Sequence, residues 1–260
     1  MTVALTRAVS PRLADCELTH LERIPIDVAR AREQHAEYER TLAELGCVVE
    51  RLDAGDEMPD SVFIEDIAVV LDEFAVVMRP GAASRRVETP GVAAALARHR
   101  SLLWIQAPAT IDGGDVLVCG RRIFIGRSSR TSDDATAQLH RIVRAHGYTV
   151  CAIPIDGCLH LKSAVTCLGG DVLLANSAWL PPAAFKDYDV IDVDAAEPMA
   201  ANALRIGDRV IFPTAFPRTA ERLARRGFDL RLVDASELAK AEGAVTCCSV
   251  IIEDNDTHGR

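Results

Sequence analysis

Three residues that lie far apart in the chain have the types needed for covalent catalysis. Cys247 lies near the C-terminus, His160 stands in an apolar run, and Asp112 opens a turn with two glycines. A thiol becomes a strong nucleophile once a base or a positive neighbour converts it to a thiolate. A nucleophile, a His base and an orienting carboxylate form a minimal catalytic set. The sequence therefore indicates cysteine-based covalent chemistry.

Each of these residues also has an ordinary structural interpretation. A His between leucines, such as His160, is more often a core residue, and Cys247 resembles the other cysteines that fill apolar runs. Cys248 competes with Cys247 as the nucleophile. We place Cys247 in a loop that leads into a strand beginning at Cys248. Neighbouring side chains of a strand point to opposite faces, so only one of the two can face a common site.

Two further pairs of charged residues suggest a ligand with groups of both signs. Glu65 and Asp66 stand directly before an apolar strand, and burying two carboxylates is costly unless they meet a cation. Arg85 and Arg130 follow the second strands of two successive predicted hairpins. Arg binds carboxylates through a bidentate fork, so both arginines could reach one ligand.

The elements that must position these residues repeat along the chain. Each unit reads as an amphipathic helix, a turn, a short apolar strand and then a hairpin. Polar landmarks precede the hairpins at intervals of 40 to 49 residues: Asp66, Asp115, Lys162, Asn202 and Cys247. Such a period is typical of repeat architectures. A doubly wound sheet would also alternate strands and helices, but it rarely has a hairpin in every unit. We therefore predict an α/β domain of five units around an axis, with the landmarks at its centre.

The expected elements can be given by residue range. The helices are expected at 27–45, 91–100, 133–145 and 219–226, with a helical turn near 183–185. The single strands are expected at 47–52, 102–105, 148–153, 189–193 and 228–233. The hairpins are expected at 67–78, 116–125, 164–175 and 203–212. A last strand at 248–252 should pair with the N-terminal strand 2–5 and close the ring. Residues 1–254 would form one domain, followed by a frayed tail at 255–260.

Composition narrows the class of protein. Of 260 residues, 49 % are hydrophobic, enough for a sizeable core, and the formal net charge is −9. This charge disfavours nucleic acid as a partner and suits a small cationic molecule. No apolar run reaches the ~20 residues of a membrane span, and the N-terminus does not read as a secretory signal. The eight cysteines contain no C-x-x-C pair, so we expect no structural zinc and a reducing cytoplasm.

These segments, in this order, resemble the guanidino-group-modifying (pentein) superfamily and, within it, the dimethylarginine dimethylaminohydrolases. The matching segments are Asp60-Ser-Val-Phe-Ile-Glu-Asp66, Arg79-Pro-Gly-Ala-Ala-Ser-Arg-Arg86, Asp112-Gly-Gly-Asp-Val-Leu117, His160-Leu-Lys-Ser163 and residues 238–251 with Thr246-Cys-Cys-Ser249. The resemblance implies a five-bladed α/β propeller with pseudo-fivefold repeats and no cofactor or metal.

The resemblance also implies a role for each candidate residue. Cys247 would attack a guanidinium carbon, and His160 would act first as general acid and then as base. Asp112 would orient His160; many relatives have Glu there, so this chain reaches one methylene less far. The substrate-binding residues would be Glu65 and Asp66 for the guanidinium, Arg85 and Arg130 for the carboxylate, and Asp60, Leu18 and the backbone near Ala241 for the amino-acid end.

The implied reaction is hydrolysis of Nω-methylated L-arginine to L-citrulline and a methylamine through a covalent S-alkylthiouronium intermediate. Deimination of free arginine or of another small guanidino compound is an alternative. A non-catalytic binding protein on the same fold is a second alternative, which the joint presence of Cys247, His160 and Asp112 disfavours. A metal-dependent hydrolase is weaker still, because no His and carboxylate have ligand spacing. The sequence leaves monomer and homodimer both open.

Overall fold

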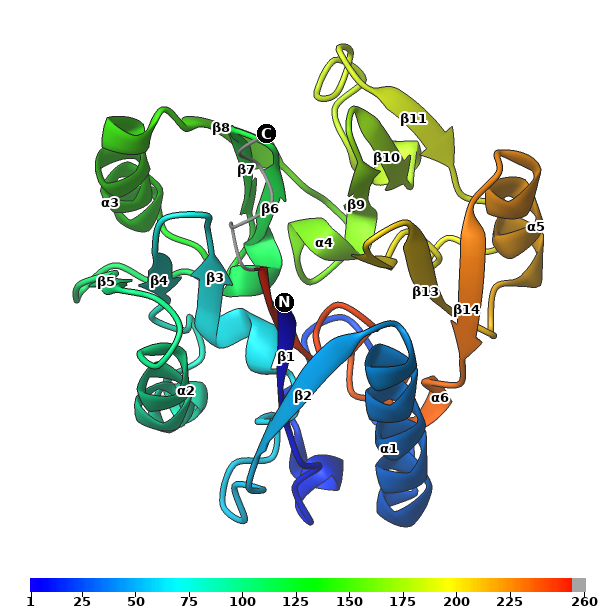
Figure 1. Cartoon of the computed structure of the whole chain (residues 1–260), viewed down its shortest axis with the longest axis horizontal. Helices are drawn as coiled ribbons and strands as arrows, with labels where there is room; N and C mark the ends of the chain where they lie inside the picture. Colours follow the sequence, from blue (N-terminus) through cyan, green and yellow to red (C-terminus); the bar gives the residue numbers. More distant parts are fainter. Residues whose placement is uncertain (254–260) are drawn as a thin grey trace.

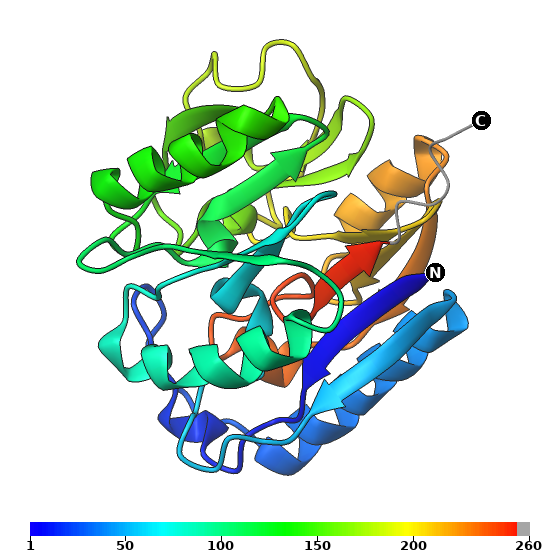
Figure 2. The same ribbon diagram turned by 60° about the vertical axis from the view of Figure 1, so that its left-hand side comes forward.

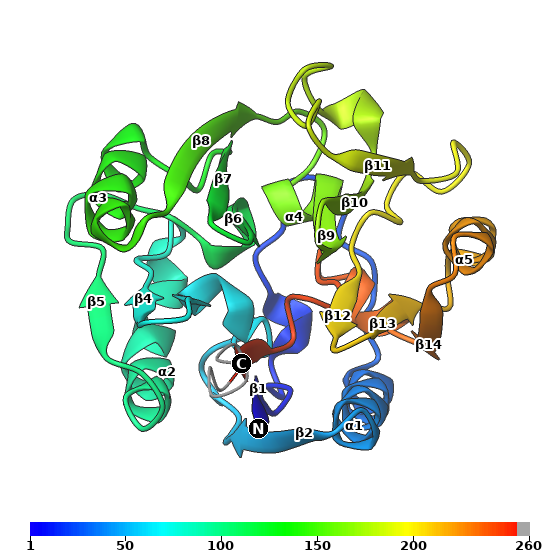
Figure 3. The same ribbon diagram turned by 45° about the horizontal axis from the view of Figure 1, so that its top comes forward.

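Five three-stranded sheets stand around a common centre in the computed structural model, which describes residues 1–253 (Figures 1 and 3). In order of hydrogen-bonded strands, the sheets are β15–β1–β2, β3–β4–β5, β6–β7–β8, β9–β10–β11 and β12–β13–β14. The tail that we predicted at 255–260 lies outside the described residues.

The strands run over β1 Thr2–Arg7, β2 Cys47–Leu52, β3 Ala68–Val70, β4 Ala75–Val77, β5 Leu102–Trp104, β6 Val116–Cys119, β7 Arg122–Arg127, β8 Thr149–Pro154, β9 Val165–Gly169, β10 Val172–Ala175, β11 Asp189–Asp192, β12 Leu204–Ile206, β13 Arg209–Pro213, β14 Asp229–Val233 and β15 Val250–Glu253. In every sheet an antiparallel pair is extended by a parallel third strand. The predicted hairpins are confirmed, and the single strand of each unit belongs to the sheet of the preceding hairpin.

The two ends of the chain share one sheet, as predicted. Strand β1 is antiparallel to β15, with Thr2 opposite Glu253 and Leu5 opposite Val250, and parallel to β2. Figure 2 shows β1 in blue between the red β15 and the lighter blue β2. The N-terminal strand therefore closes the ring of sheets by hydrogen bonding to segments from both ends of the sequence.

The longer helices lie on the outside of the ring (Figure 1). The helices run over α1 Val28–Glu44, α2 Thr89–Leu96, α3 Asp133–Val143, α4 Leu161–Ala164, α5 Pro217–Arg225 and α6 Ser236–Ala239. Helix α3 begins where the Ser132 side chain accepts a bond from the Ala135 amide. Leu139 and Val143, four residues apart on one face, pack into a buried cluster with Ile125 of β7. Among residues 1–253, no helix has the length and apolar character needed to cross a bilayer.

Residues 183–185 lie in a hydrogen-bonded turn, in which the Ala184 amide donates to the Pro181 carbonyl at 2.9 Å. One local expectation was wrong: Cys248 lies with Cys247 in a turn and not in the predicted strand, because β15 begins only at Val250. The physical reason is local hydrogen bonding: the Cys247 amide donates to the Ala244 carbonyl at 3.2 Å, which keeps this backbone out of the sheet. The alternation argument for choosing between the two thiols therefore does not apply.

The polar landmarks of neighbouring units contact one another at the centre. The Asn202 amide nitrogen donates to Thr246 Oγ1 at 2.9 Å and to the Lys162 carbonyl at 3.0 Å, and its oxygen accepts from the Thr246 amide at 3.0 Å. Asp115 likewise accepts from the Leu161 amide at 3.0 Å. These buried bonds join loops from different units, so they fix the ring at the place where the chemistry is expected.

Replacing Asn202 by Ala should lower the free energy of unfolding by about 2–4 kcal/mol, because the buried Thr246 amide and Lys162 carbonyl would lose their partner. Urea denaturation followed by circular dichroism measures this change. Gln138→Ala, which removes a side chain bonded only to the exposed Gln106 backbone, should change stability by less than about 0.5 kcal/mol. Equal effects of the two substitutions would contradict a structural role for the central bonds.

Candidate active site

The three predicted catalytic residues line one small cavity at the centre of the ring. Cys247 comes from the turn before β15, His160 from the residue before α4, and Asp112 from the residue before a short 3-10 helix, Gly113–Asp115. His160 and Asp112 are both buried. Each side chain therefore stands beside the inner strand of a different sheet, which fixes its direction.

Asp112 holds the imidazole of His160 by one nitrogen. Asp112 Oδ2 lies 3.0 Å from His160 Nε2, and Oδ1 accepts a bond from the Gly81 amide at 2.8 Å. The shorter Asp side chain thus reaches the imidazole. His160 Nδ1 lies on the other side, 3.8 Å from Asp66 Oδ1. Burial lowers the pKa of His160, but the charge of Asp66 and the bond to Asp112 together raise it to about 9. The imidazole is therefore an imidazolium at neutral pH.

The two glycines after Asp112 permit this close packing. A Cβ at Gly113 would come within 2.0 Å of the Glu65 carbonyl oxygen. A Cβ at Gly114 would come within 2.6 Å of His160 Nδ1 and within 2.8 Å of Asp66 Oδ1. Any larger residue would have to displace backbone or the reactive imidazole, so this turn needs glycine at both positions.

The two neighbouring thiols differ sharply in their surroundings. Cys247 lines the cavity, whereas Cys248 is buried in the core and donates to the Ala244 carbonyl at 3.5 Å. Burial and the charges of Glu65 and Asp66 raise the pKa of Cys247 to about 12. Burial also raises the pKa of Cys248 well above its ordinary value. The geometry makes Cys247 the candidate nucleophile, and its thiol is protonated in the ligand-free protein.

The adjacent carboxylates Glu65 and Asp66 point to different places. Asp66 lines the cavity and accepts a bond from the Gly114 amide at 3.0 Å. Glu65 is turned away from the cavity, with Lys162 Nζ at 2.6 Å and Thr246 Oγ1 at 2.8 Å. Both residues lie in a 3-10 helix, where side chains project about 120° apart. Only Asp66 borders the cavity in this conformation, and a role for Glu65 in ligand binding stays a prediction.

Arg85 lines the cavity but is largely occupied by protein groups. Its guanidinium forms a two-point ion pair with buried Glu88, at 3.0 and 2.9 Å, and a hydrogen bond to Asp66. It also donates to the Phe63 carbonyl at 2.9 Å and to the Asp60 carbonyl at 3.2 Å. One hydrogen on Nη1 has no partner among these contacts. Arg85 thus neutralises the buried carboxylates and has little capacity left for a ligand carboxylate.

Arg130 is the more available arginine. It is half-buried, lines the same cavity, and Nη2 bonds to the exposed Thr19 hydroxyl at 2.9 Å. Its loop packs against the loop of Arg85, because a Cβ at Gly81 would come within 2.6 Å of the Arg130 carbonyl oxygen. The two loops therefore lie against each other, and both arginines border the same cavity, while their binding of one ligand stays a prediction.

The segment around Leu18 covers the cavity and is pinned by Glu242. The Glu242 carboxylate accepts bonds from the amides of Thr19, His20 and Leu21, the last two at 2.5 and 2.7 Å. Glu242 does so from a left-handed backbone conformation, with φ at 59°, which is uncommon for a residue other than glycine. Leu18 itself is half-buried against the core and does not border the cavity.

Asp60 and Ala241, both predicted to meet the amino-acid end of a ligand, do line the cavity. Burial raises the pKa of Asp60 to about 6, and its carboxylate accepts from the Glu17 amide at 3.2 Å. Sequence reasoning missed four lining residues: Glu17, Phe63, Leu159 and Glu242. Each is next to, or three residues from, a predicted one, so the neighbouring motif was the only available signal.

Within residues 1–253, one set of three side chains has the arrangement of a metal site. Ligand atoms of Asp66, Asp112 and His160 all lie within 4.8 Å of one another. All three are already engaged: Asp112 with His160, and Asp66 with Arg85. We interpret the set as an acid–base cluster rather than a metal centre.

The cavity is small in this conformation. Its free volume is about 20 Å³, which is room for about one water molecule. A larger ligand could enter only if the covering segment that Glu242 holds moved away.

Comparison with known proteins assigns the family. The family model described as "N,N dimethylarginine dimethylhydrolase, eukaryotic" matches residues 21–212. An N(G),N(G)-dimethylarginine dimethylaminohydrolase of Streptomyces coelicolor is 40 % identical over 250 residues, 95 % of each chain. The enzyme of the same name from Pseudomonas aeruginosa is 35 % identical over 226 residues, 86 % of this chain and 89 % of the relative.

Solved structures agree with this assignment. A mutant of the P. aeruginosa protein complexed with citrulline superposes with a TM-score of 0.91 at 33 % identity, covering 96 % of this chain and 98 % of that one. An adduct of a dimethylarginine dimethylaminohydrolase with S-methyl-L-thiocitrulline gives the same TM-score and identity, over 97 % and 100 % of the two chains. The N-terminal domain of the cyanobacterial arginine dihydrolase ArgZ shares the fold, with a TM-score of 0.87 at 21 % identity, over 98 % and 99 %. The resemblance seen in the sequence is thus confirmed: the chain belongs to the dimethylarginine dimethylaminohydrolase family.

Proposed function

We propose that this protein hydrolyses Nω-methylated L-arginine to L-citrulline and a methylamine. One observation carries the proposal: a thiol, a clamped imidazolium and a buried carboxylate, Cys247, His160 and Asp66, line the same cavity. The names of the relatives and the citrulline complex support the substrate class. A cationic substrate also fits the charge of the site. The neighbours of Asp66 neutralise its negative charge only partly, so this carboxylate would pair with the guanidinium.

We further infer that residues 1–254 form one catalytic domain, a five-bladed α/β propeller, in which each three-stranded sheet is a blade. The pairing of β1 with β15 supports this description. A cytoplasmic location is supported by the eight cysteines, all of which are free thiols. We propose no cofactor or metal.

The polar residues around the cavity suggest how the substrate is held. The guanidinium would pair with Asp66. Glu65 would not contact it directly; it would bind Lys162 and, through its negative charge, raise the pKa of Cys247. Arg130 would bind the carboxylate, with the remaining Nη1 hydrogen of Arg85 as a second donor. Asp60 and the backbone at Ala241 would contact the amino-acid end, and Leu18, which does not border the cavity in this conformation, would do so only after the covering segment moves.

The first chemical step would form a carbon–sulfur bond. A bound guanidinium lowers the pKa of Cys247 by direct charge attraction, so the thiol loses its proton to solvent. The thiolate attacks the guanidinium carbon. As the bond from that carbon to the methylated nitrogen breaks, His160 donates a proton from Nδ1, because Nε2 is held by Asp112. The methylamine departs, and an S-alkylthiouronium cation remains on Cys247.

The second step would release the product. His160, now neutral, accepts a proton from a water molecule as the water oxygen attacks the same carbon. The carbon–sulfur bond then breaks, the remaining hydroxyl proton of the intermediate passes to the departing Cys247 sulfur, and neutral citrulline forms. His160 ends protonated, as it began. The carboxylates around His160 raise its pKa, which favours this proton uptake in the second step.

The proposed function predicts that the wild-type protein releases citrulline from monomethylarginine and asymmetric dimethylarginine faster than from arginine. Cys247→Ser should lower that rate by at least about 10³-fold, because it removes the nucleophile. Cys248→Ser is the matched control and should keep most of the activity. Faster turnover of arginine would favour the deiminase alternative. No turnover of any of the three, and no labelling of Cys247 by an arginine-like electrophile, would favour a non-catalytic binding protein.

The imidazolium of His160 predicts where the pH profile levels off. Productive binding requires the Cys247 thiol to lose its proton and His160 to keep its own, so kcat/KM should rise with pH and level off as pH passes about 9. Asp112→Asn should move this point, and the NMR titration of His160, to lower pH by about one unit, because a charged partner of the imidazolium is lost. An unchanged His160 titration in this variant would show that Asp112 does not set the imidazole pKa.

Glu242→Gln should loosen the covering segment. A neutral acceptor binds the amides of Thr19, His20 and Leu21 less strongly than a carboxylate does. Hydrogen exchange at these amides in the ligand-free protein should become roughly tenfold faster, equivalent to about 1.4 kcal/mol. Glu237→Gln, in helix α6 close to Glu242 in the sequence but bonded to the Asp27 amide and to Lys240, should leave the exchange unchanged. Equal exchange in both variants would mean that Glu242 does not hold the segment.

A further inference from the structure

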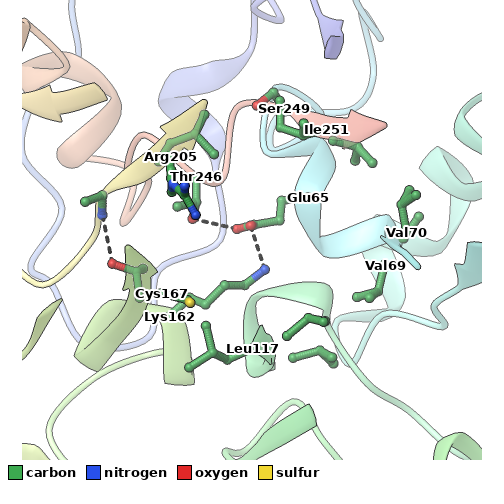
Figure 4. A pocket seen from close by; sticks show the side chains of 17 residues that line it. Glu65, Val69, Val70, Leu117, Lys162, Cys167, Arg205, Thr246, Ser249 and Ile251 are labelled. Carbon is green, nitrogen blue, oxygen red and sulfur yellow. Dashed lines mark hydrogen bonds and ion pairs between the residues drawn. The ribbon is translucent and has the colours of Figure 1, made fainter. Parts of the chain in front are cut away.

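A second cavity lies along the axis, beyond the Glu65–Lys162 ion pair. It has a volume of about 220 Å³ and is lined by the inner strands of the five sheets, and it shares no lining residue with the cavity of Cys247. Figure 4 shows Glu65 bonded to Lys162 and Thr246, with Cys167 and Arg205 nearby. The reaction proposed above uses neither Cys167 nor Arg205.

Cys167 is paired with a second thiol behind the cavity wall. Cys167 lies on β9 and Cys119 ends β6, and these are the inner strands of neighbouring sheets. The two strands bring Cα atoms within 8 Å of each other, and both thiols belong to one apolar cluster, where each acts on the pKa of the other. A disulfide needs Cα atoms about 4.4–6.8 Å apart, a spacing that two neighbouring strands can provide.

The pair is asymmetric in exposure and in charge. Cys119 is buried, whereas Cys167 borders the cavity. The neighbouring Cys119 thiol, the Gly169 amide and the Arg205 charge favour a thiolate on Cys167 and outweigh burial and Asp171; they lower the pKa of Cys167 to about 7. The neighbouring Cys167, burial and Asp171 raise the pKa of Cys119. Because Cys167 also borders the cavity while Cys119 is buried, Cys167 is the candidate nucleophile and Cys119 the candidate resolving thiol.

We propose that Cys119 and Cys167 form a peroxide-reactive dithiol site, separate from the active site, that closes to an intramolecular disulfide. The other thiols lack this combination. Cys151 is exposed and its sulfur bonds only to the adjacent Ala152 carbonyl, and Cys158 is buried and bonds to the His160 carbonyl.

The oxidation balances with a hydroperoxide as the only co-reactant. The Cys167 thiolate attacks one peroxide oxygen and the O–O bond breaks; Cys167 becomes a sulfenic acid and hydroxide, or the alkoxide of an organic peroxide, leaves. The Cys119 sulfur then attacks the sulfenic sulfur, and an S–S bond replaces the S–O bond. The released hydroxide takes the Cys119 proton. Two thiols and hydrogen peroxide thus give one disulfide and two molecules of water.

The test is peptide mapping of the full chain after treatment with hydrogen peroxide. The reduced protein is exposed to equimolar peroxide at pH 7, alkylated in denaturant, digested without reductant and analysed by mass spectrometry. We expect a cross-linked peptide containing Cys119 and Cys167, two hydrogens lighter than its parts and absent after dithiothreitol. It should form roughly tenfold faster than oxidation of Cys151, because a larger share of Cys167 is thiolate.

Single substitutions separate the two roles. In Cys119→Ser, or Cys119→Ala if the serine variant does not fold, Cys167 should be trapped by dimedone as a sulfenic acid. In Cys167→Ser, Cys119 should stay reduced. The proposal is overturned if both thiols of the wild-type protein are fully alkylated after peroxide. It is also overturned if wild-type Cys167 accumulates as a sulfenic acid. None of these readouts uses catalytic turnover, so they are independent of the proposed function.

Discussion

The arrangement of the site depends on one buried carboxylate, that of Asp66. It accepts bonds from the Gly114 amide and from Arg85, and it lies 3.8 Å from His160 Nδ1. Removing one partner of such a buried charge commonly costs about 3–5 kcal/mol. Asp66 therefore ties together the hairpin loop that carries Arg85, the glycine turn after Asp112 and the loop that carries His160. These three segments belong to successive units, so one charge positions residues from most of the ring.

The same carboxylate raises the pKa of both His160 and Cys247, with opposite consequences for the reaction. It favours the imidazolium of His160, which the departing amine needs, and it disfavours the thiolate of Cys247. A site with these charges alone is poorly suited to nucleophilic attack at neutral pH. A cation placed beside Asp66 would reverse the second effect and partly offset the first. We therefore expect the resting site to react slowly with neutral electrophiles and faster once an organic cation is bound, which would be a physical basis for selectivity.

The fold was predictable because its signals are local and repeated. Glycine or acidic turns marked the hairpins, apolar runs marked the strands, and the spacing of Asp66, Asp115 and Lys162 indicated that their loops meet. The catalytic trio followed from residue type and order. What the sequence could not give is side-chain direction in irregular backbone. Glu65 and Asp66 are adjacent in a 3-10 helix and diverge, and the turn at Cys247 defeated an argument based on strand alternation. Neither outcome follows from a hydrophobic pattern, because both depend on hydrogen bonds made to distant loops.

Contacts between units explain why the sequence did not indicate the roles of Glu242, Cys119 and Cys167. Glu242 binds the amides of the segment after Leu18, more than 200 residues away in sequence, and it does so from a left-handed conformation that no local motif announces. In the sequence, Cys119 and Cys167 look like two core thiols in separate strands. Only the packing of successive sheets around the ring brings β6 against β9. A ring of repeats turns each inner strand into a neighbour of a strand one unit further along the chain. Residues at equivalent depths in successive units then meet by symmetry of the fold rather than by any feature of their own sequence. Pairs at matching depths on adjacent inner strands are therefore the places where further chemistry in such rings should be sought.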